Sequence, residues 1–270
     1  MRRSPIHDFR TRYGPWAVVA GASQGMGEAY AQQVAALGLN VVLIARREPL
    51  LHALAARLSD QHRIETRMLP LDLARDDAAA QVDAATRDLD VGLLIYNAAR
   101  SVIGPFLDRP LDAHLDELAV NTRAPMTLAY LFGQRMKARG HGGIIVMSSL
   151  ASAQGSPITA NYAATKAYNL VLAEGLWDEL RRQRVDVLAC VAGATSTPNY
   201  DASAPKGSGI GSATLTPAAV VAAALAALGR QPSVIPGRAN RASAFVMRRL
   251  LPRRTAVSIM GRVLRGMYGE

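Results

Sequence analysis

The chain has 270 residues, half of them hydrophobic, and a formal net charge of +10. This length suits one large α/β domain or two small ones and permits a sizeable buried core. The single cysteine, Cys190, excludes a disulfide framework. Aromatic residues are few, whereas Ala and Leu dominate the apolar set, and this composition favours helices packed on a sheet over an all-β fold.

The excess positive charge belongs to the last part of the chain. From Ala202 to Gly269 there is no Asp or Glu, but there are nine arginines and Lys206. No recognition motif accompanies this charge, so nucleic acid is not an expected partner. The first 14 residues are polar, unlike a signal peptide, and no apolar stretch is long enough to span a bilayer. A cytoplasmic location is therefore expected.

Short apolar runs alternate with helical patterns along most of the chain. The predicted strands are residues 17–20, 40–45, 68–71, 91–96, 143–147 and 185–191. The predicted helices are residues 28–37, 50–58, 78–89, 111–139 and 162–184. Pro125 is expected to bend or split the helix that contains it. Buried strands alternating with helices predict a parallel sheet covered on both faces, in a single domain of residues 1–270.

A glycine-rich turn joins the first predicted strand to the first predicted helix. It consists of Gly21-Ala22-Ser23-Gln24-Gly25-Met26-Gly27, with the spacing G-x-x-x-G-x-G. Glycines let the backbone approach a pyrophosphate closely, and the helix N-terminus adds free N–H groups. Such turns also occur for packing reasons alone, but the strand-to-helix context favours a dinucleotide site.

The residues after the second predicted strand indicate which dinucleotide is bound. A ribose 2′-hydroxyl is usually held there by an acidic residue, and a 2′-phosphate by arginine. This chain has Arg46 and Arg47, and its first carboxylate there is Glu48. Guanidinium groups form charge-assisted hydrogen bonds with phosphate, so NADP(H) is predicted over NAD(H). The alternative is that the two arginines only solvate a helix entrance. Asp72, just after the third strand, is placed to reach the edge of the adenine ring.

A tyrosine and a lysine stand four residues apart in the 162–184 helix. Tyr162 and Lys166 therefore lie on one face, a turn apart. A nearby ammonium group lowers the pKa of a phenol from about 10, which makes Tyr162 a usable acid or base. Ser149, at the end of the fifth strand, is placed to hydrogen-bond a substrate oxygen. Asn121 is placed to bind a water that joins Lys166 to solvent.

Taken in order, these motifs identify a resemblance to the short-chain dehydrogenase/reductase family, in its single-domain branch. The resemblance runs from Val18 to about Pro198 and covers, in the family's order, Gly21-x-x-x-Gly25-x-Gly27, Asp72, Asn97-Ala98-Ala99, Asn121, Ser149, Tyr162-x-x-x-Lys166 and Ala192-Gly193-x-x-x-Thr197. The departures are Ala20 in place of threonine, Tyr96 and Ala99 in place of the outer residues of N-N-A-G, and Ala192 in place of proline. They affect loop packing and cofactor affinity and leave the catalytic residues intact.

The resemblance implies a Rossmann-like, doubly wound sheet of about seven strands and direct hydride transfer. Tyr162 would be the acid/base, Lys166 would tune it and hold the nicotinamide ribose, and Ser149 would orient the carbonyl. Asn121 would hold the proton-relay water. The implied cofactor-binding residues are Gly21, Ser23, Gln24, Gly25, Met26, Gly27, Arg46, Arg47, Asp72, Leu73, Asn97, Ala98, Ala99, Tyr162, Lys166, Gly193, Thr195 and Thr197. Homodimers or homotetramers are usual in this family.

Two segments outside these motifs are also expected to have roles. Residues 195–215 are rich in Gly, Ser, Pro and Thr and are expected to form a lid over the substrate. Residues 240–270 form a basic extension whose apolar spacing from Ala256 to Met267 predicts an amphipathic helix. This extension is expected to pack at a subunit interface or beside the substrate entrance. The alternatives are peripheral contact with an anionic membrane and attraction of an acidic substrate.

The sequence therefore predicts an NADP(H)-dependent oxidoreductase that interconverts a ketone or aldehyde and an alcohol. A weaker likeness of residues 16–58 to membrane-associated 3-oxoacyl-CoA and 17β-hydroxysteroid reductases points to an apolar, acyl or steroid-like substrate. The alternative function is a non-catalytic NADP(H)-binding redox sensor, against which the presence of both Tyr162 and Lys166 argues. The five histidines are scattered, so no metal site is predicted.

Overall fold

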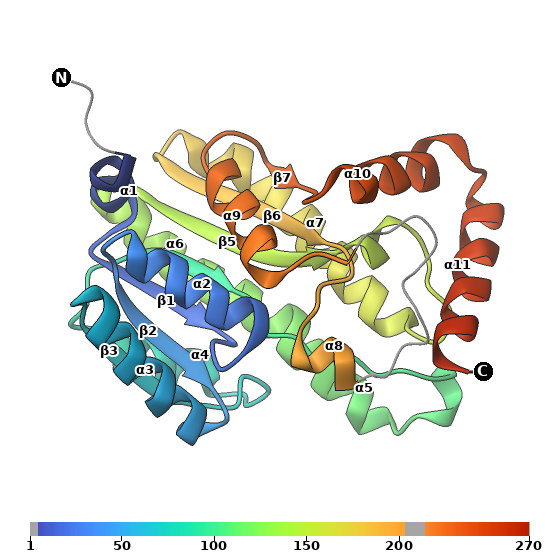
Figure 1. Cartoon of the computed structure of the whole chain (residues 1–270), viewed down its shortest axis with the longest axis horizontal. Coiled ribbons are helices and arrows are strands. Elements are labelled where there is room, and N and C mark those ends of the chain that lie inside the picture. The colour runs from blue at the N-terminus through green and yellow to red at the C-terminus, as the bar shows by residue number, and fades with distance from the viewer. Residues whose placement is uncertain (1–4, 203–213, 270) are drawn as a thin grey trace.

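The computed structural model describes residues 5–202 and 214–269, and within them strands and helices alternate (Figure 1). The sheet has seven strands, namely β1 (Trp16–Ala20), β2 (Asn40–Ala45), β3 (Thr66–Pro70), β4 (Val91–Tyr96), β5 (Gly142–Ser149), β6 (Val185–Ala192) and β7 (Ser233–Val234). Neighbouring strands are all parallel, in the order β3-β2-β1-β4-β5-β6-β7. The predicted doubly wound sheet is confirmed. Its winding reverses between β1 and β4, where such sheets open a crevice at the carboxyl ends of their strands.

Helices cover both faces of the sheet. They are α1 (Pro5–Tyr13), α2 (Gly25–Ala36), α3 (Glu48–His62), α4 (Ala78–Thr86), α5 (Leu111–Leu118), α6 (Ala124–Arg139), α7 (Ala160–Arg181), α8 (Pro198–Ala202), α9 (Pro217–Ala227), α10 (Arg238–Phe245) and α11 (Arg253–Tyr268). Apolar side chains of α2, α3 and α9 form one buried cluster with alternate strand residues such as Val19. Those of α4, α6 and α7 form a second cluster with residues such as Val18. Strands buried on both faces explain their nearly continuous apolar runs.

The helix predicted over residues 111–139, with a bend or split at Pro125, is divided in the structure. Helix α5 passes into a π-helical turn, Ala119–Arg123, before α6 begins. Pro125 lies in the first turn of α6, two residues after the π-helical turn ends. The interruption is therefore the π-helical turn just before the proline. Such turns concentrate at functional sites, and Asn121 lies in this one.

Helices α8 and α9 and strand β7 are not among the elements predicted from the local pattern, and the two ends of the chain hold further differences. Helix α1 is not predicted by the sequence, because its short polar segment lacks a clear apolar face. The same is true of α10 and the π-helical turn after it, Val246–Leu250. The amphipathic helix expected in the tail is confirmed as α11, which begins three residues before Ala256. Helix α2 begins at Gly25 and not at Glu28, because the glycine turn itself forms its first turn.

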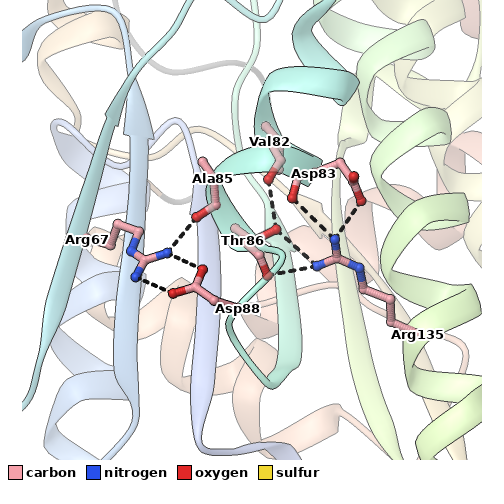
Figure 2. A network of polar contacts seen from close by, with 7 residues as sticks. All are labelled: Arg67, Val82, Asp83, Ala85, Thr86, Asp88 and Arg135. Carbon is pink, nitrogen blue, oxygen red and sulfur yellow. Dashed lines mark hydrogen bonds and ion pairs between the residues drawn. The ribbon is translucent and has the colours of Figure 1, made fainter.

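Two arginines hold the C-terminal end of α4, as Figure 2 shows. Arg67 of β3 donates to the Ala85 carbonyl at 2.8 Å and to the two carboxylate oxygens of Asp88 at 2.6 and 2.8 Å. Arg135 of α6 donates to the carbonyl and to the hydroxyl of Thr86, each at 3.0 Å. The last carbonyls of a helix lack partners within it, and here cationic side chains from both neighbours bind them. We call Arg67, Thr86, Asp88 and Arg135 the α4 clamp.

Candidate active site

The turn between β1 and α2 requires glycine at three of its positions. Gly21 and Gly25 have φ values of +82° and +60°, in the left-handed region. A Cβ on Gly21 would lie 2.7 Å from the Ala98 backbone, and one on Gly27 would overlap the Gly21 carbonyl oxygen. The turn is therefore packed so tightly, against the end of β4 and against itself, that neither Gly21 nor Gly27 has room for a side chain.

The Gly27→Ala substitution is expected to lower the free energy of unfolding by about 2–3 kcal/mol, because the new methyl group must displace the Gly21 carbonyl. It should also weaken dinucleotide binding. Chemical unfolding and a cofactor titration measure both effects. Gly175→Ala is the matched control, since Gly175 lies inside α7 and a methyl group added there would have no atom within 4 Å. That control should be stabilising by about 0.5–1 kcal/mol, and a Gly27 variant as stable as it would contradict the tight packing.

The same turn fits a dinucleotide. Gln24 precedes α2 without capping it through its side chain, so the first N–H groups of the helix keep their capacity for an anion. Asn97 donates to the Gly21 carbonyl at 3.1 Å, while its buried Oδ1 atom has no partner among the described residues. The glycine cradle and the helix N-terminus match a phosphate, and the unsatisfied acceptor matches a hydrogen-bond donor of the same ligand, such as a ribose hydroxyl. Ser23, Met26 and the Ala98–Ala99 pair border this cradle in the chain.

The two predicted phosphate-binding arginines stand at the end of β2, beside the glycine turn. Arg47 donates to the Ser23 hydroxyl at 2.9 Å. Arg46 lies 3.9 Å from a carboxylate oxygen of Asp72, and both of these side chains are largely exposed. Asp72 also accepts from the backbone N–H of Ala74 at 3.0 Å, while the adjacent Leu73 is buried. Both guanidinium groups are thus near the cradle and mostly free to bind an added phosphate.

Tyr162 and Lys166 lie together on α7, next to the end of β5. Lys166 is only 2% exposed, and its Nζ atom donates to the Met147 carbonyl at 3.2 Å. The same Nζ atom is 5.6 Å from the centroid of the Tyr162 ring. Burial lowers the pKa of Lys166 to about 8, against the opposing effect of Glu117. The predicted neighbourhood of phenol and amine is therefore present.

The lowering of the Tyr162 pKa that the sequence predicts involves the amine together with a bound dinucleotide, and it stays a prediction. Burial raises the pKa of Tyr162, and a hydrogen bond with Ser149 only partly offsets this rise. The reason is that a buried phenolate loses solvation, and Lys166 is not among the groups that lower this pKa. Ser149 also accepts a hydrogen bond from the Ala151 N–H at 3.2 Å, at the start of the short 3₁₀ helix Leu150–Ala153.

Asn121 joins three parts of the site. Its Oδ1 atom accepts from the Arg100 N–H at 2.8 Å, and its Nδ2 atom donates to the Arg100 carbonyl at 2.8 Å and to the Thr165 hydroxyl at 3.1 Å. Its side chain is therefore engaged by protein, and the expected relay water remains a prediction. Tyr96, one of the departures from the family pattern, donates to the carbonyl of Val120 in the same π-helical turn.

The segment after β6 crosses the glycine turn. Thr195 donates to the Gly193 carbonyl at 3.0 Å, and Thr197 accepts from the Tyr200 N–H at 3.2 Å. A Cβ on Gly25 would lie 3.1 Å from a side-chain carbon of Thr197, so this threonine sits against the turn. The predicted lid of residues 195–215 falls partly outside the described residues, because 203–213 are not among them.

Sequence reasoning missed three residues of this region. Glu117 is fully buried and acts on the pKa of both Tyr162 and Lys166. Asn161 donates to it at 2.7 Å. Glu117 stands four residues before Asn121 on a helical pattern, and this spacing could have drawn attention to it. The end of α11 lies near enough to the site for Tyr268 to raise the pKa of Tyr162. No sequence signal predicts this approach.

Helix α11 reaches the site by packing on the segment after β5, at the right of Figure 1. Arg253 donates to the Ala153 carbonyl at 2.7 Å, and a Cβ on Gly261 would lie 2.9 Å from the Pro157 ring. Across residues 5–202 and 214–269, the structure contains neither a group of three or more side chains able to hold a metal ion nor a helix able to cross a membrane.

Residues 15–208, well over half of the chain, match the family model described as short chain dehydrogenase. The chain belongs to the short-chain dehydrogenase family. The resemblance found from the motifs is thus confirmed, and with it the class of enzyme, an oxidoreductase whose fold binds NAD(P).

Relatives within the short-chain dehydrogenase family extend the match over most of the chain. A 7beta-hydroxysteroid dehydrogenase of Mediterraneibacter gnavus is 32% identical over 238 residues, which are 87% of this chain and 90% of that protein. A solved 7beta-hydroxysteroid dehydrogenase structure has a TM-score of 0.87 at 31% identity, covering 93% of this chain and 98% of that one. A short-chain dehydrogenase from Sphingobium yanoikuyae in complex with NADPH has a TM-score of 0.77 at 31% identity, covering 86% and 92%.

Proposed function

We propose that this short-chain dehydrogenase interconverts a bulky apolar ketone and its alcohol with NADP(H), and that Tyr162 exchanges the proton. The observation that carries the proposal is the meeting of two features at one edge of the sheet. The pair Tyr162 and Lys166 stands beside the end of β5, and the glycine cradle with its arginines stands beside the ends of β1 and β2. In a parallel sheet all these strand ends share one edge, so both features open on one crevice.

The protein's part in the reaction follows from its polar groups. A bound nicotinamide cofactor supplies or accepts the hydride. During reduction, Ser149 hydrogen-bonds the substrate carbonyl and Tyr162 donates its proton to the oxygen as the carbon becomes tetrahedral. Lys166 binds the ribose and, when charged, stabilises the phenolate that remains. Asn121 links the π-helical turn to α7 through its hydrogen bond to Thr165, and this link helps to hold Tyr162 in position.

The preference for NADP(H) rests on charge. A 2′-phosphate carries negative charge that Arg46 and Arg47 can bind through charge-assisted hydrogen bonds. The carboxylate that lies nearest Arg46, that of Asp72, is 3.9 Å away and leaves the guanidinium mostly exposed. The relative from Sphingobium yanoikuyae is in complex with NADPH, which supports the same choice. Gly193, Thr195 and Thr197 would hold the nicotinamide end.

The proposed substrate class is a steroid-like or comparably bulky ketone. Two relatives that match most of this chain are 7beta-hydroxysteroid dehydrogenases. In this chain α11 packs on Pro157 and ends near enough for Tyr268 to raise the pKa of Tyr162, so the tail would form one wall of the substrate site. This position favours the substrate entrance among the roles considered for the basic extension.

The proposed assembly is a cytoplasmic homodimer or homotetramer of single-domain subunits. Helices α5, α6 and α7 expose large apolar side chains that a second copy would cover, namely Leu111, Leu115, Met126, Tyr130, Tyr168 and Val171. Phe245 and Leu250 are exposed among the arginines of the tail and are the residues through which peripheral contact with an anionic membrane would occur.

A substrate screen with NADPH and NADH in parallel tests the proposed function. The panel should contain oxo-steroids, 3-oxoacyl thioesters and small ketones at equal concentration. We expect turnover of the oxo-steroids and a higher kcat/KM with NADPH than with NADH. Turnover of no ketone by protein that binds NADPH tightly would overturn the proposal.

A further inference from the structure

Glu117 is a buried carboxylate that the reaction described above does not use. It stands on α5 and is fully buried, whereas Leu111 and Leu115 on the same helix are exposed. In the ordinary pattern a helix buries its leucines and exposes its acidic residues, and α5 does the reverse at these positions. Burial of a charge is costly unless the charge is paired. The placement therefore requires a specific set of partners.

Those partners are hydrogen-bond donors, one for each carboxylate oxygen. Oε1 accepts from the Val102 N–H at 2.9 Å, and Oε2 accepts from the Asn161 side chain at 2.7 Å. An arrangement of two N–H donors suits the ionised form, because a protonated oxygen would itself need an acceptor. Burial raises the pKa of Glu117, while both hydrogen bonds and the charges of His114 and Lys166 lower it.

The groups that face Glu117 connect it to the catalytic pair. From α7, Lys166 and Tyr162 lie near enough for the charge of Glu117 to raise their pKa values, and from its own helix His114 lowers the pKa of Glu117. The flanking Asp116 is paired with Arg100 at 2.8 Å and so contributes little net charge. Asn161, which binds Glu117, immediately precedes Tyr162 in α7. The carboxylate thus acts on the amine and the phenol both through space and through its hydrogen bond to their helix.

We propose that Glu117 is a positioning residue whose charge keeps Lys166 and Tyr162 protonated while the enzyme reduces a ketone. This inference rests on the proposed function of Tyr162. A negative charge makes the loss of a proton from either neighbour harder, so it raises the pKa of both. Since reduction needs the phenol as proton donor and the amine as cation, Glu117 extends activity toward alkaline pH.

The Glu117→Gln substitution tests this through the pH profile of kcat/KM for ketone reduction. Removal of the charge lowers the pKa of both groups, so the alkaline limb should move to lower pH by about one unit. At a pH above the alkaline limbs of both proteins, this shift lowers kcat/KM of the variant about tenfold relative to the wild-type protein. Near pH 6.5 kcat/KM should fall much less. The Glu117→Asp substitution keeps the charge, so the alkaline limb of its pH profile should stay near the wild-type position.

Asn161→Ala is the matched structural control. It removes a hydrogen bond to Glu117 and so raises the pKa of that carboxyl, but the carboxyl should still be charged at the alkaline limb. The substitution should lower activity at all pH values without moving the limb. A Glu117→Gln profile that is lowered uniformly, with an unmoved limb, would overturn the proposal while leaving the role of Tyr162 intact. The wild-type protein gives a second test that needs no variant. Carbon NMR should find the Glu117 carboxyl ionised at pH 8, and a carboxyl still protonated there would also overturn it.

Discussion

The Tyr162→Phe substitution is expected to lower kcat for ketone reduction by about 10³-fold, within the range that general acid catalysis contributes. Phenylalanine keeps the ring but lacks the proton that the developing alkoxide needs. The amine of Lys166 cannot replace it, since its Nζ atom donates to the Met147 carbonyl and lies 5.6 Å from the ring centroid. Single-turnover measurements with NADPH would isolate this chemical step.

Binding of the cofactor should be almost unchanged in this variant, which separates a lost proton donor from a damaged fold. Tyr168→Phe is the matched control, because Tyr168 stands on the same helix and is 41% exposed. Its kcat should equal that of the wild-type protein. A Tyr162→Phe enzyme with more than a tenth of the wild-type kcat would assign the proton to another group.

Replacing both Arg46 and Arg47 with alanine is expected to raise KM for NADPH by about 10- to 100-fold. A hydrogen bond to a charged group contributes about 1.5–3 kcal/mol, and the two arginines are the cations at the end of β2. KM for NADH should change little, because NADH lacks the 2′-phosphate. Initial rates with each cofactor at a saturating ketone concentration provide the comparison.

Arg87→Ala is the control for the loss of a surface arginine. Arg87 follows α4 at the opposite edge of the sheet and pairs only weakly with Asp83, at 3.7 Å. Its removal should leave both KM values unchanged. An equal rise in KM for NADPH and NADH in the double variant would mean that the arginines support the fold of the turn and do not select the phosphate.

The sheet and the order of its elements could be predicted because they depend on local signals. Buried strands need apolar runs, and the glycines of the first turn are required by backbone geometry at Gly21 and Gly25. A bend or split near Pro125 could also be predicted. The π-helical form of the turn before it could not, because Asn121 is held there by the backbone of Arg100, 21 residues earlier.

A motif is enough to propose Tyr162 and Lys166 as the catalytic pair, but their electrostatic surroundings could not be predicted. The pKa of Tyr162 depends on burial, on Ser149 and on Glu117 from another helix, and none of these contributions follows from the spacing of Tyr162 and Lys166. The same holds for Tyr268, whose approach depends on how α11 packs on Pro157. Local periodicity in the sequence predicts helices, whereas the pKa values inside a site depend on which groups the tertiary structure places around it.

The α4 clamp lies at the amino edge of the sheet, since Arg67 is the second residue of β3 and α4 leads directly into β4. The crevice lies at the other edge. Anchorage of α4 and turnover are therefore mechanically separate, and changes at Arg67 or Arg135 should alter how readily the protein unfolds without altering its kinetic constants. The loops at the carboxyl ends of the strands can therefore change in sequence, and with them the substrate, without weakening the contacts that hold α4 at the opposite edge.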